Sequence, residues 1–358
     1  MAHVPRVEAK LEELIIGGRK ILPGESVSID LPVAMLHTQT PLSMPVQIRR
    51  GRKSGPTLFI SAAIHGDELN GIEVIRRLHQ HKSLSRLHGT LITIPIVNVF
   101  GVIEHSRYLP DRRDLNRSFP GSVRGSLAGR LANLFMTEIV ANCTHGIDIH
   151  TGAMHRSNLP QLRVNLEDPE TEQLARAFGV PVIINSDLRD GSLRQAASEQ
   201  GIPMLLYEAG EALRFDEIAI RAGVKGIVNV MRTLGMLPKS SYKSRSAIEP
   251  LIARSSSWVR APESGIFRAF AALGSRVKKD DVLGVVDSPF GDNEEEVLAP
   301  SAGLVIGKTS LPLINEGDAL FHIAKFQAVQ EVAENVEAFT ETLTDSVPDD
   351  QLLEPPII

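Results

Sequence analysis

The sequence predicts an α/β protein with a doubly wound sheet, followed by a smaller all-β domain. From residue 57 to residue 234, short apolar runs of strand length alternate with segments of helical periodicity. Beyond residue 258, short strand patterns replace this alternation, and one passage occurs twice. With 358 residues, the chain is long enough for one large and one small domain.

Composition limits the classes of partner. The chain is 42% hydrophobic and 23% charged, which is typical of a globular protein with a packed core. A formal net charge of -5 offers no broad basic field, so we expect neither nucleic acid nor an anionic membrane as partner. The sequence has no apolar run of the ~18 residues that a membrane helix needs, and its start lacks the features of a signal peptide. The single cysteine, Cys143, fits a reducing compartment and a core position, so we expect a cytoplasmic protein.

The first elements build one side of the predicted sheet. Residues 21–50 alternate polar and apolar side chains between prolines and glycines, which predicts short antiparallel strands at a sheet edge. The run TLFISAAI at 57–64 is apolar throughout, as in a strand buried on both faces of a parallel sheet. Residues 68–79 have helical apolar spacing, and 91–99 form the next predicted strand. A long polar loop over 101–121 follows.

The later elements continue the alternation up to a change of composition. We expect helices over 127–140, 170–177, 192–200 and 215–234, and strands over 146–150, over 180–185 and in the run ending near Glu208. A serine-rich connection between Leu237 and Trp258 then indicates a domain boundary. The predicted domains are therefore a catalytic domain over 1–245, a small β domain over 246–327 and a partly helical acidic tail over 328–358.

Three chemically active residues directly follow predicted strands. They are His65, His150 and Glu208, and the carboxyl ends of strands are where ligands gather in open α/β sheets. Glu68, three residues after His65, can lie on the same side of a starting helix. His65, Glu68 and His150 thus form a two-histidine, one-carboxylate set suited to one catalytic zinc ion. Asp148 either orients a histidine ligand or is a buried strand residue satisfied by backbone; both readings stay open.

Glu208 and an arginine-rich loop supply the other candidate groups. Glu208 is the best-placed general base for a metal-bound water, the alternative being an ordinary glutamate at a helix start. The loop carries Arg107, Arg113, Asn116 and Arg117, which form either a solvated basic face or a substrate site. In the second case, Asn116 and Arg117 suit bidentate capture of a carboxylate, and an arginine near the metal stabilises an oxyanion.

Four motifs carry a family resemblance. HGDELNG, DLNRSFPG, DIHTG and YEAG occur in this order between residues 65 and 210. Together they resemble the succinylglutamate desuccinylase and aspartoacylase family, which belongs to the carboxypeptidase A-like zinc hydrolases. The resemblance implies a doubly wound mixed sheet of zinc carboxypeptidase type.

The resemblance also implies roles for individual residues. His65, Glu68 and His150 would bind zinc, Glu208 would act as general base and acid, and Asn116 with Arg117 would hold the substrate carboxylate. Arg107 resembles the arginine that polarises the scissile carbonyl, with Arg113 as competitor. Arg194 resembles a further carboxylate-binding arginine, or is a surface helix residue.

The duplicated C-terminal passage has a second resemblance. APESGIF followed by VKKDDVLGVV, and APSAGLV followed by INEGDALFHI, are similar to the biotinyl and lipoyl carrier barrel. The stretch VVDSPFGDNEEEV between the halves has no lysine, which argues against a covalent swinging arm. We expect this domain to shape or cover the active-site mouth, or to mediate formation of a homo-oligomer.

The implied reaction is hydrolysis of the amide bond of a small N-acyl amino acid. Neither the acyl group nor the amino acid can be read from the residues. Two alternatives remain at this stage: a metallocarboxypeptidase acting on small peptides, and a non-catalytic protein that binds a carboxylate ligand.

Overall fold

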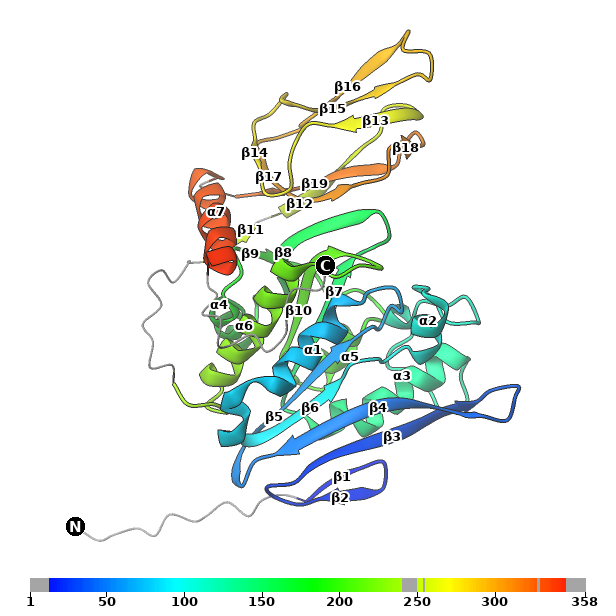
Figure 1. Ribbon diagram of the computed structural model, residues 1–358, viewed down its shortest axis with the longest axis vertical. Helices are drawn as coiled ribbons and strands as arrows, with labels where there is room; N and C mark the ends of the chain where they lie inside the picture. Colours follow the sequence, from blue (N-terminus) through cyan, green and yellow to red (C-terminus); the bar gives the residue numbers. More distant parts are fainter. Residues whose placement is uncertain (1–12, 240–249, 254, 327–328, 346–358) are drawn as a thin grey trace, which may run out of the picture.

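The computed structural model describes residues 13–239, 250–253, 255–326 and 329–345. A large mixed sheet crosses the molecule, with neighbouring strands in the order β12-β19-β17-β8-β10-β7-β5-β6-β4-β3 (Figure 1). Its strands in the first part of the chain are β3 (Ser26–Met35), β4 (Pro41–Arg50), β5 (Lys53–Ala62), β6 (His88–Ile94), β7 (His145–Gly152), β8 (Arg156–Val164), β9 (Val182–Asn185) and β10 (Met204–Glu211). A separate hairpin joins β1 (Leu14–Ile16) to β2 (Arg19–Ile21).

The centre of the sheet is parallel. β5 pairs in parallel with β6 on one side and β7 on the other, and β10 pairs in parallel with β7. Antiparallel pairs extend both sides, since β4 and β3 follow β6 and β8 follows β10. This confirms the expected α/β class with a mixed sheet and places the predicted early strands at an edge.

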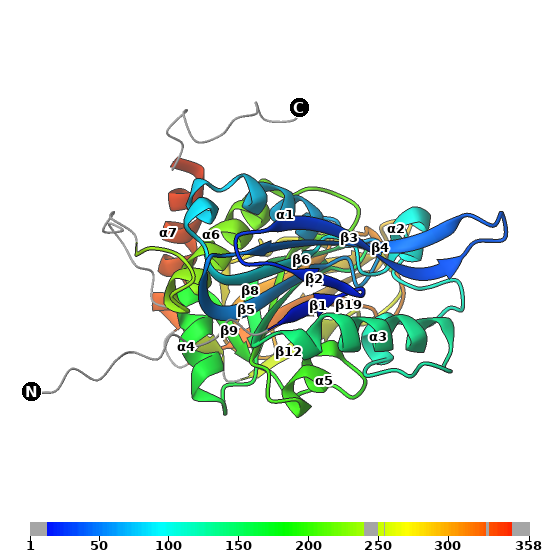
Figure 2. The same ribbon diagram turned by 90° about the horizontal axis from the view of Figure 1, so that it is seen from below.

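Helices cover both faces of the sheet (Figure 2). Their bounds are α1 (Asn70–Gln80), α2 (Val99–Glu104), α3 (Leu127–Glu138), α4 (Pro169–Phe178), α5 (Leu193–Glu199), α6 (Glu217–Thr233) and α7 (Val329–Asp345). α1, α4 and α6 share one hydrophobic cluster, whereas α3 and α5 share another. β5 contributes side chains to both clusters, because Leu58 and Ile60 pack in the first and Phe59 packs in the second. The unbroken apolar run of this strand follows from that double burial.

Two parts of this region differ from the expectation. The strand predicted over 91–99 ends at Ile94. α2 begins at Val99 and extends into the loop expected from residue 101, with the side chain of Asn98 capping the Gly101 N–H. β8, where the sequence predicts no element, is a strand antiparallel to β10. Its sequence RSNLPQLRV places polar Asn158 and Gln161 at buried positions, so it lacks the apolar run of its neighbours.

The C-terminal β unit, residues 255–325, attaches directly to the main sheet. Its strands are β12 (Ser255–Arg260), β13 (Gly265–Ala269), β14 (Arg276–Val277), β15 (Val282–Asp287), β16 (Glu294–Leu298), β17 (Gly303–Thr309), β18 (Leu313–Ile314) and β19 (Ala319–Lys325). β12, β19 and β17 extend the large sheet through pairing of β17 with β8. β16, β15, β13 and β18 form a separate four-stranded sheet.

The pairings of this unit reflect its sequence duplication. β13 opens the first half and pairs with β18 of the second, while β17 opens the second half and pairs with β14 of the first. The all-β character is as expected, but the pairings define two sheets, so the barrel form stays a prediction. The boundary expected at residues 245 and 246 lies outside the described residues.

α7 links the two parts of the molecule. Phe339 and Leu343 pack in the cluster of α1 and α6, and Val336 packs with residues of β17 and β19. This helix begins the acidic tail, and residues 346–358 lie outside the described ranges. Within the described residues, no helix is long and apolar enough to cross a membrane.

Candidate active site

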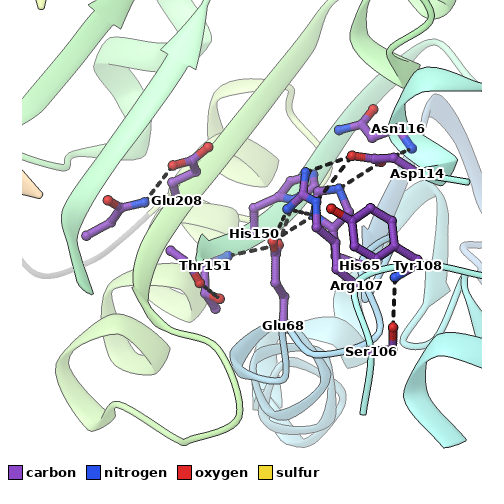
Figure 3. Close-up of polar contacts among 12 residues, drawn as sticks. His65, Glu68, Ser106, Arg107, Tyr108, Asp114, Asn116, His150, Thr151 and Glu208 are labelled. Atoms are coloured by element: carbon purple, nitrogen blue, oxygen red, sulfur yellow. Dashed lines mark hydrogen bonds and ion pairs between the residues drawn. The ribbon is translucent and has the colours of Figure 1, made fainter. Parts of the chain in front are cut away.

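A cavity of about 240 Å³ lies where β5, β7 and β10 end. It is lined by His65, Glu68 and His150 on one side and by Glu208 on another. Figure 3 shows these side chains, with His65 and His150 meeting above Glu68 and Glu208 standing apart on its own strand. The structure therefore brings together residues that are up to 143 positions apart, as counted from His65 to Glu208.

The His65, Glu68 and His150 side chains converge. His65 Nδ1 lies 2.6 Å from Glu68 Oε1, and His150 Nδ1 lies 2.7 Å from Glu68 Oε2. All three residues are buried, and one ligand atom from each lies within 4.8 Å of the others. A turn creates this geometry, because the Glu68 N–H donates to the His65 carbonyl before α1 begins at Asn70. Gly66 is required in that turn, since a Cβ there would lie 1.9 Å from the backbone of Gly101.

The Nε2 atom of each histidine, on the side of the ring away from Glu68, lies near an aspartate carboxylate. His150 Nε2 lies 2.7 Å from Asp148 Oδ2, and Ser61 Oγ donates to the other Asp148 oxygen. His65 Nε2 lies 3.2 Å from Asp114 Oδ1. A carboxylate at Nε2 favours a proton on that nitrogen and leaves the Nδ1 lone pair for a cation. Of the two readings of Asp148, the geometry favours the orienting one.

The electrostatics of the cluster suit a cation. Burial alone would raise the pKa of Glu68, but His65 and His150 hold it well below its usual range. Burial opposes protonation of His150, yet Asp148 and Glu68 outweigh it and raise the pKa of the ring. The cluster thus keeps one buried carboxylate, Glu68, ionised between two imidazoles, an arrangement that suits a cation. Two imidazole nitrogens and one carboxylate, each fixed by a second contact, fit a zinc ion with an open position.

Arg107 lies beside this cluster, and Arg113 does not. Arg107 Nη1 is 3.4 Å from Glu68 Oε1, and its Nη2 donates to Asp114 Oδ2 at 2.9 Å. The Arg113 side chain is 63% exposed, and its nearest carboxylate is Asp111 at 3.8 Å. Of the two arginines that competed for the role next to the scissile carbonyl, only Arg107 lines the cavity.

Asn116 and Arg117 also line the cavity. They lie on a short 3-10 helix, Leu115–Arg117, where the Asn116 N–H donates to Asp114 Oδ1. The Asn116 side-chain oxygen accepts from the Leu193 N–H at 3.0 Å. Asp114 therefore contacts both His65 and the start of this segment, which couples the cluster of His65, Glu68 and His150 to the expected carboxylate clamp.

Glu208 is held by two residues of β8. Asn158 Nδ2 donates to Glu208 Oε2 at 2.7 Å, and Arg163 Nε lies 3.2 Å from Glu208 Oε1 as an ion pair without an aligned hydrogen bond. Regular pairing of β10 with β7 breaks between Glu208 and Glu211, so the carboxylate stands at the point where the strand turns away.

Arginines form a second positive group in the same cavity. Arg163, Arg189 and Arg194 all line it, and burial together with Arg163 and Arg189 lowers the pKa of Arg194 to about 10. Arg194 is 7% exposed; its Nη2 donates to the Asp187 carbonyl, and its buried Nη1 has no partner in the described part of the chain. Arg194 is therefore a cavity residue rather than a surface helix residue.

The C-terminal β unit contributes Trp258 to the cavity. The Trp258 indole, from β12, stacks on His322 with ring centroids 4.6 Å apart and packs under the Arg156 guanidinium at 5.3 Å. Burial and the nearby Arg163 lower the pKa of His322 to about 3, so this ring is neutral at physiological pH. One wall of the cavity thus belongs to the unit expected to shape its mouth.

Several of these residues were absent from the sequence prediction. Asp114 lies in DLNR and was available from the motif, but spacing alone does not show that it faces His65. Asn158 and Arg163 lie on β8, whose strand pattern is weak, and Trp258 reaches the cavity through pairing of distant strands.

Comparison with known proteins places this geometry in a family. A model of the succinylglutamate desuccinylase/aspartoacylase catalytic domain matches residues 54–234, just over half of the chain. N-alpha-acetyl-L-2,4-diaminobutyric acid deacetylase from Halomonas elongata is 26% identical over 293 residues, covering 79% of this chain and 85% of that protein.

Solved structures show the same architecture. The product-bound ectoine utilization protein EutE (DoeB) from Ruegeria pomeroyi superposes with a TM-score of 0.75 at 25% identity, covering 85% of this chain and 97% of that one. The succinylglutamate desuccinylase/aspartoacylase from Rhodobacter sphaeroides also gives a TM-score of 0.75, at 23% identity, with 84% and 95% covered. The second likeness is one of fold alone.

Proposed function

Because the chain belongs to the succinylglutamate desuccinylase/aspartoacylase family, we propose that it is a zinc-dependent hydrolase that cleaves the amide bond of an N-acyl amino acid. One observation carries the proposal beyond the family: the His65, Glu68 and His150 cluster and the Glu208 carboxylate line the same cavity. A cation site and a proton acceptor in one enclosed space are what amide hydrolysis by water requires.

The proposed metal ligands are His65, Glu68 and His150. When bound, a zinc ion lowers the pKa of a coordinated water to about 7 and polarises a carbonyl oxygen. Asp148 and Asp114 keep the Nδ1 atoms of His150 and His65 directed at the cluster. The two aspartates thereby orient the histidine ligands without a bound metal.

Glu208 is the proposed general base and acid. Its carboxylate accepts a proton from the attacking water and delivers it to the nitrogen of the departing amine. Asn158 donates to Glu208 Oε2 and Arg163 lies 3.2 Å from Oε1, so both carboxylate oxygens are held in a defined orientation.

Arginines are the proposed partners for the negative charges of the substrate and the transition state. Arg107 lies against the metal cluster, where its guanidinium donates to the oxygen that becomes negative when the carbonyl is attacked. Asn116 and Arg117 hold the carboxylate of the amino acid, and Arg194 supplies a further donor. The cavity lining therefore favours substrates that carry a free carboxylate.

The reaction test uses purified protein loaded with zinc and a panel of N-acetyl and N-succinyl amino acids. We expect release of free amine and carboxylate in equal amounts from at least one member, with small peptides as the comparison set. A panel that stays inert at full zinc occupancy contradicts the proposal, and faster cleavage of peptides would favour a metallocarboxypeptidase. The name of the Halomonas relative makes an N-acetylated diamino acid the first compound to try.

A further inference from the structure

A second cavity, of about 680 Å³, opens at the opposite edge of the sheet. β5 begins in it at Lys53 and β6 begins in it at His88, whereas the other end of β5 leads to His65 and the metal cluster. The two cavities are thus separated by the length of one buried strand. A ligand in the second cavity would not occupy the substrate site.

The lining of this second cavity is strongly basic. Five of its residues carry a positive charge: Arg49, Arg50, Arg52, Lys53 and Arg86. Among its described lining residues, Glu25 is the sole acid, and Arg19 at 2.6 Å and the Leu22 N–H at 2.9 Å already engage its carboxylate. This local positive charge contrasts with the formal net charge of -5 for the whole chain.

The cavity wall is structured, yet four of its cations have no carboxylate partner among the described residues. Arg50 is 7% exposed, and its Nη1 donates to the Ile21 carbonyl at 2.6 Å. The stem of Arg52 lies across Gly24, where a Cβ would be 3.1 Å from Arg52 Cγ. By contrast, no described carboxylate pairs with Arg49, Arg52, Lys53 or Arg86, a set gathered at the start of β5 and around it.

Arginines on the outer helices behave differently. Arg77 pairs with Glu73 and Glu217, and Arg176 pairs with Glu172. Within the described residues, these helix arginines thus have carboxylate partners that Arg49, Arg52, Lys53 and Arg86 lack. Grouped cations repel one another, and a bound anion would relieve that repulsion.

We propose that this cavity binds a small anion with two or more phosphate groups. Guanidinium groups bind phosphate oxygens in pairs, and several of them together favour multiple charges. The volume is in the range of small-molecule sites. Its described lining has no Phe, Tyr or Trp on which bases would stack, and the net negative charge of the chain opposes a long polyanion. A compact oligophosphate, free or as part of a nucleotide, is the class that fits.

Calorimetric titration of the zinc-loaded full chain with inorganic tripolyphosphate tests the proposal, with ATP as a second arm. We expect binding at a site distinct from the active-site arginines, with an affinity that falls with added salt. The triple variant Arg52→Ala, Lys53→Ala, Arg86→Ala should bind at least about tenfold more weakly. These side chains are exposed or at the cavity rim, and a thermal melt confirms folding. The matched control, Lys278→Ala with Lys279→Ala, removes exposed charges from the C-terminal β unit and should bind as wild type.

A metal-site variant separates the two cavities. His65→Ala should keep tripolyphosphate binding, because the proposed site does not use the zinc ligands. ATP binding with similar affinity supports recognition of the phosphate chain. Absence of binding, equal binding by the triple variant, loss of binding in His65→Ala, or much tighter binding of single-stranded RNA would each overturn the proposal.

Discussion

The candidate active site has a metal half, His65, Glu68 and His150, and an arginine half, Arg163, Arg189 and Arg194. They differ in how many of their polar atoms already have partners within the chain. In the metal half, His65 and His150 each contact Glu68 on one side and an aspartate on the other. In the arginine half, Arg194 Nη1 is buried without a partner in the described residues. The pKa of Arg189 is lowered, mainly by burial and further by the neighbouring Arg163 and Arg117.

This difference indicates what each half is built to meet. The metal half is an arrangement that needs only a cation, since its ligand atoms are already directed at one point. The arginine half has a hydrogen-bond donor without a partner and positive charges that repel one another. An anionic group of the substrate would accept from the donor and offset the charges. We infer that the first half sets the chemistry and the second sets which molecule is accepted.

Changing Glu68, the proposed shared metal ligand, should have the largest effect. Glu68→Gln removes the negative charge that joins the two histidines, so we expect loss of bound zinc and hydrolysis at background level. Metal analysis and an amine-release assay measure both. A thermal melt checks that the fold survives. A variant that keeps stoichiometric zinc and full turnover would show that Glu68 is not a ligand.

The aspartate behind His150 should matter less than the ligand itself. Asp148→Asn weakens the acceptor for His150 Nε2, and we expect zinc affinity to fall about 10–100-fold. Competition with a chelating dye gives the affinity. Asp30→Asn, at an exposed position on β3, is the matched control and should leave it unchanged. Equal affinities in the two variants would contradict the orienting role.

In the arginine half, the expected effect is on substrate binding. Arg194→Ala should raise KM by about tenfold while kcat changes little, because its free donor meets the substrate before the reaction. The control is Arg113→Ala, which removes the same charge outside the cavity and should leave both constants unchanged. A loss confined to kcat would place Arg194 in the chemical step instead.

A smaller effect should follow when the support of Glu208 is disturbed. Gly307 of β17 pairs with Asn158, and a Cβ on Gly307 would lie 2.8 Å from Asn158 Oδ1. Asn158→Ala should lower kcat by up to about tenfold, since a hydrogen bond to a charged group is lost. Gly307→Ala should act through Asn158, so the double variant should resemble Asn158→Ala. Additive losses would show that the two residues act independently.

The same two halves differ in how far the sequence predicts them. His65 and His150 follow apolar runs that end at a sheet edge, and local pattern is enough to place such residues together. Glu208 follows the same rule.

The arginine half depends on information that local pattern does not contain. Asn158 and Arg163 lie on a strand with buried polar residues and a central proline, a pattern that does not predict a strand. Pairing with β10 and β17 makes it one. Trp258 follows a connection beyond the first domain and enters the cavity only because β12 extends the sheet through β19. Long-range pairing decides these positions, so the fold class and Arg194 were predictable, whereas Asn158, Arg163 and Trp258 were not.

The central claim is that one cavity joins a zinc site to a separate proton carrier, and Glu208→Gln tests it most directly. Zinc content and amine release are measured on the same preparation of variant and wild type. We expect one zinc per chain in both, with kcat lower in the variant by about 10²–10⁴-fold, the usual contribution of general acid–base catalysis. Undiminished turnover with zinc retained would contradict the claim, and so would loss of zinc from the variant.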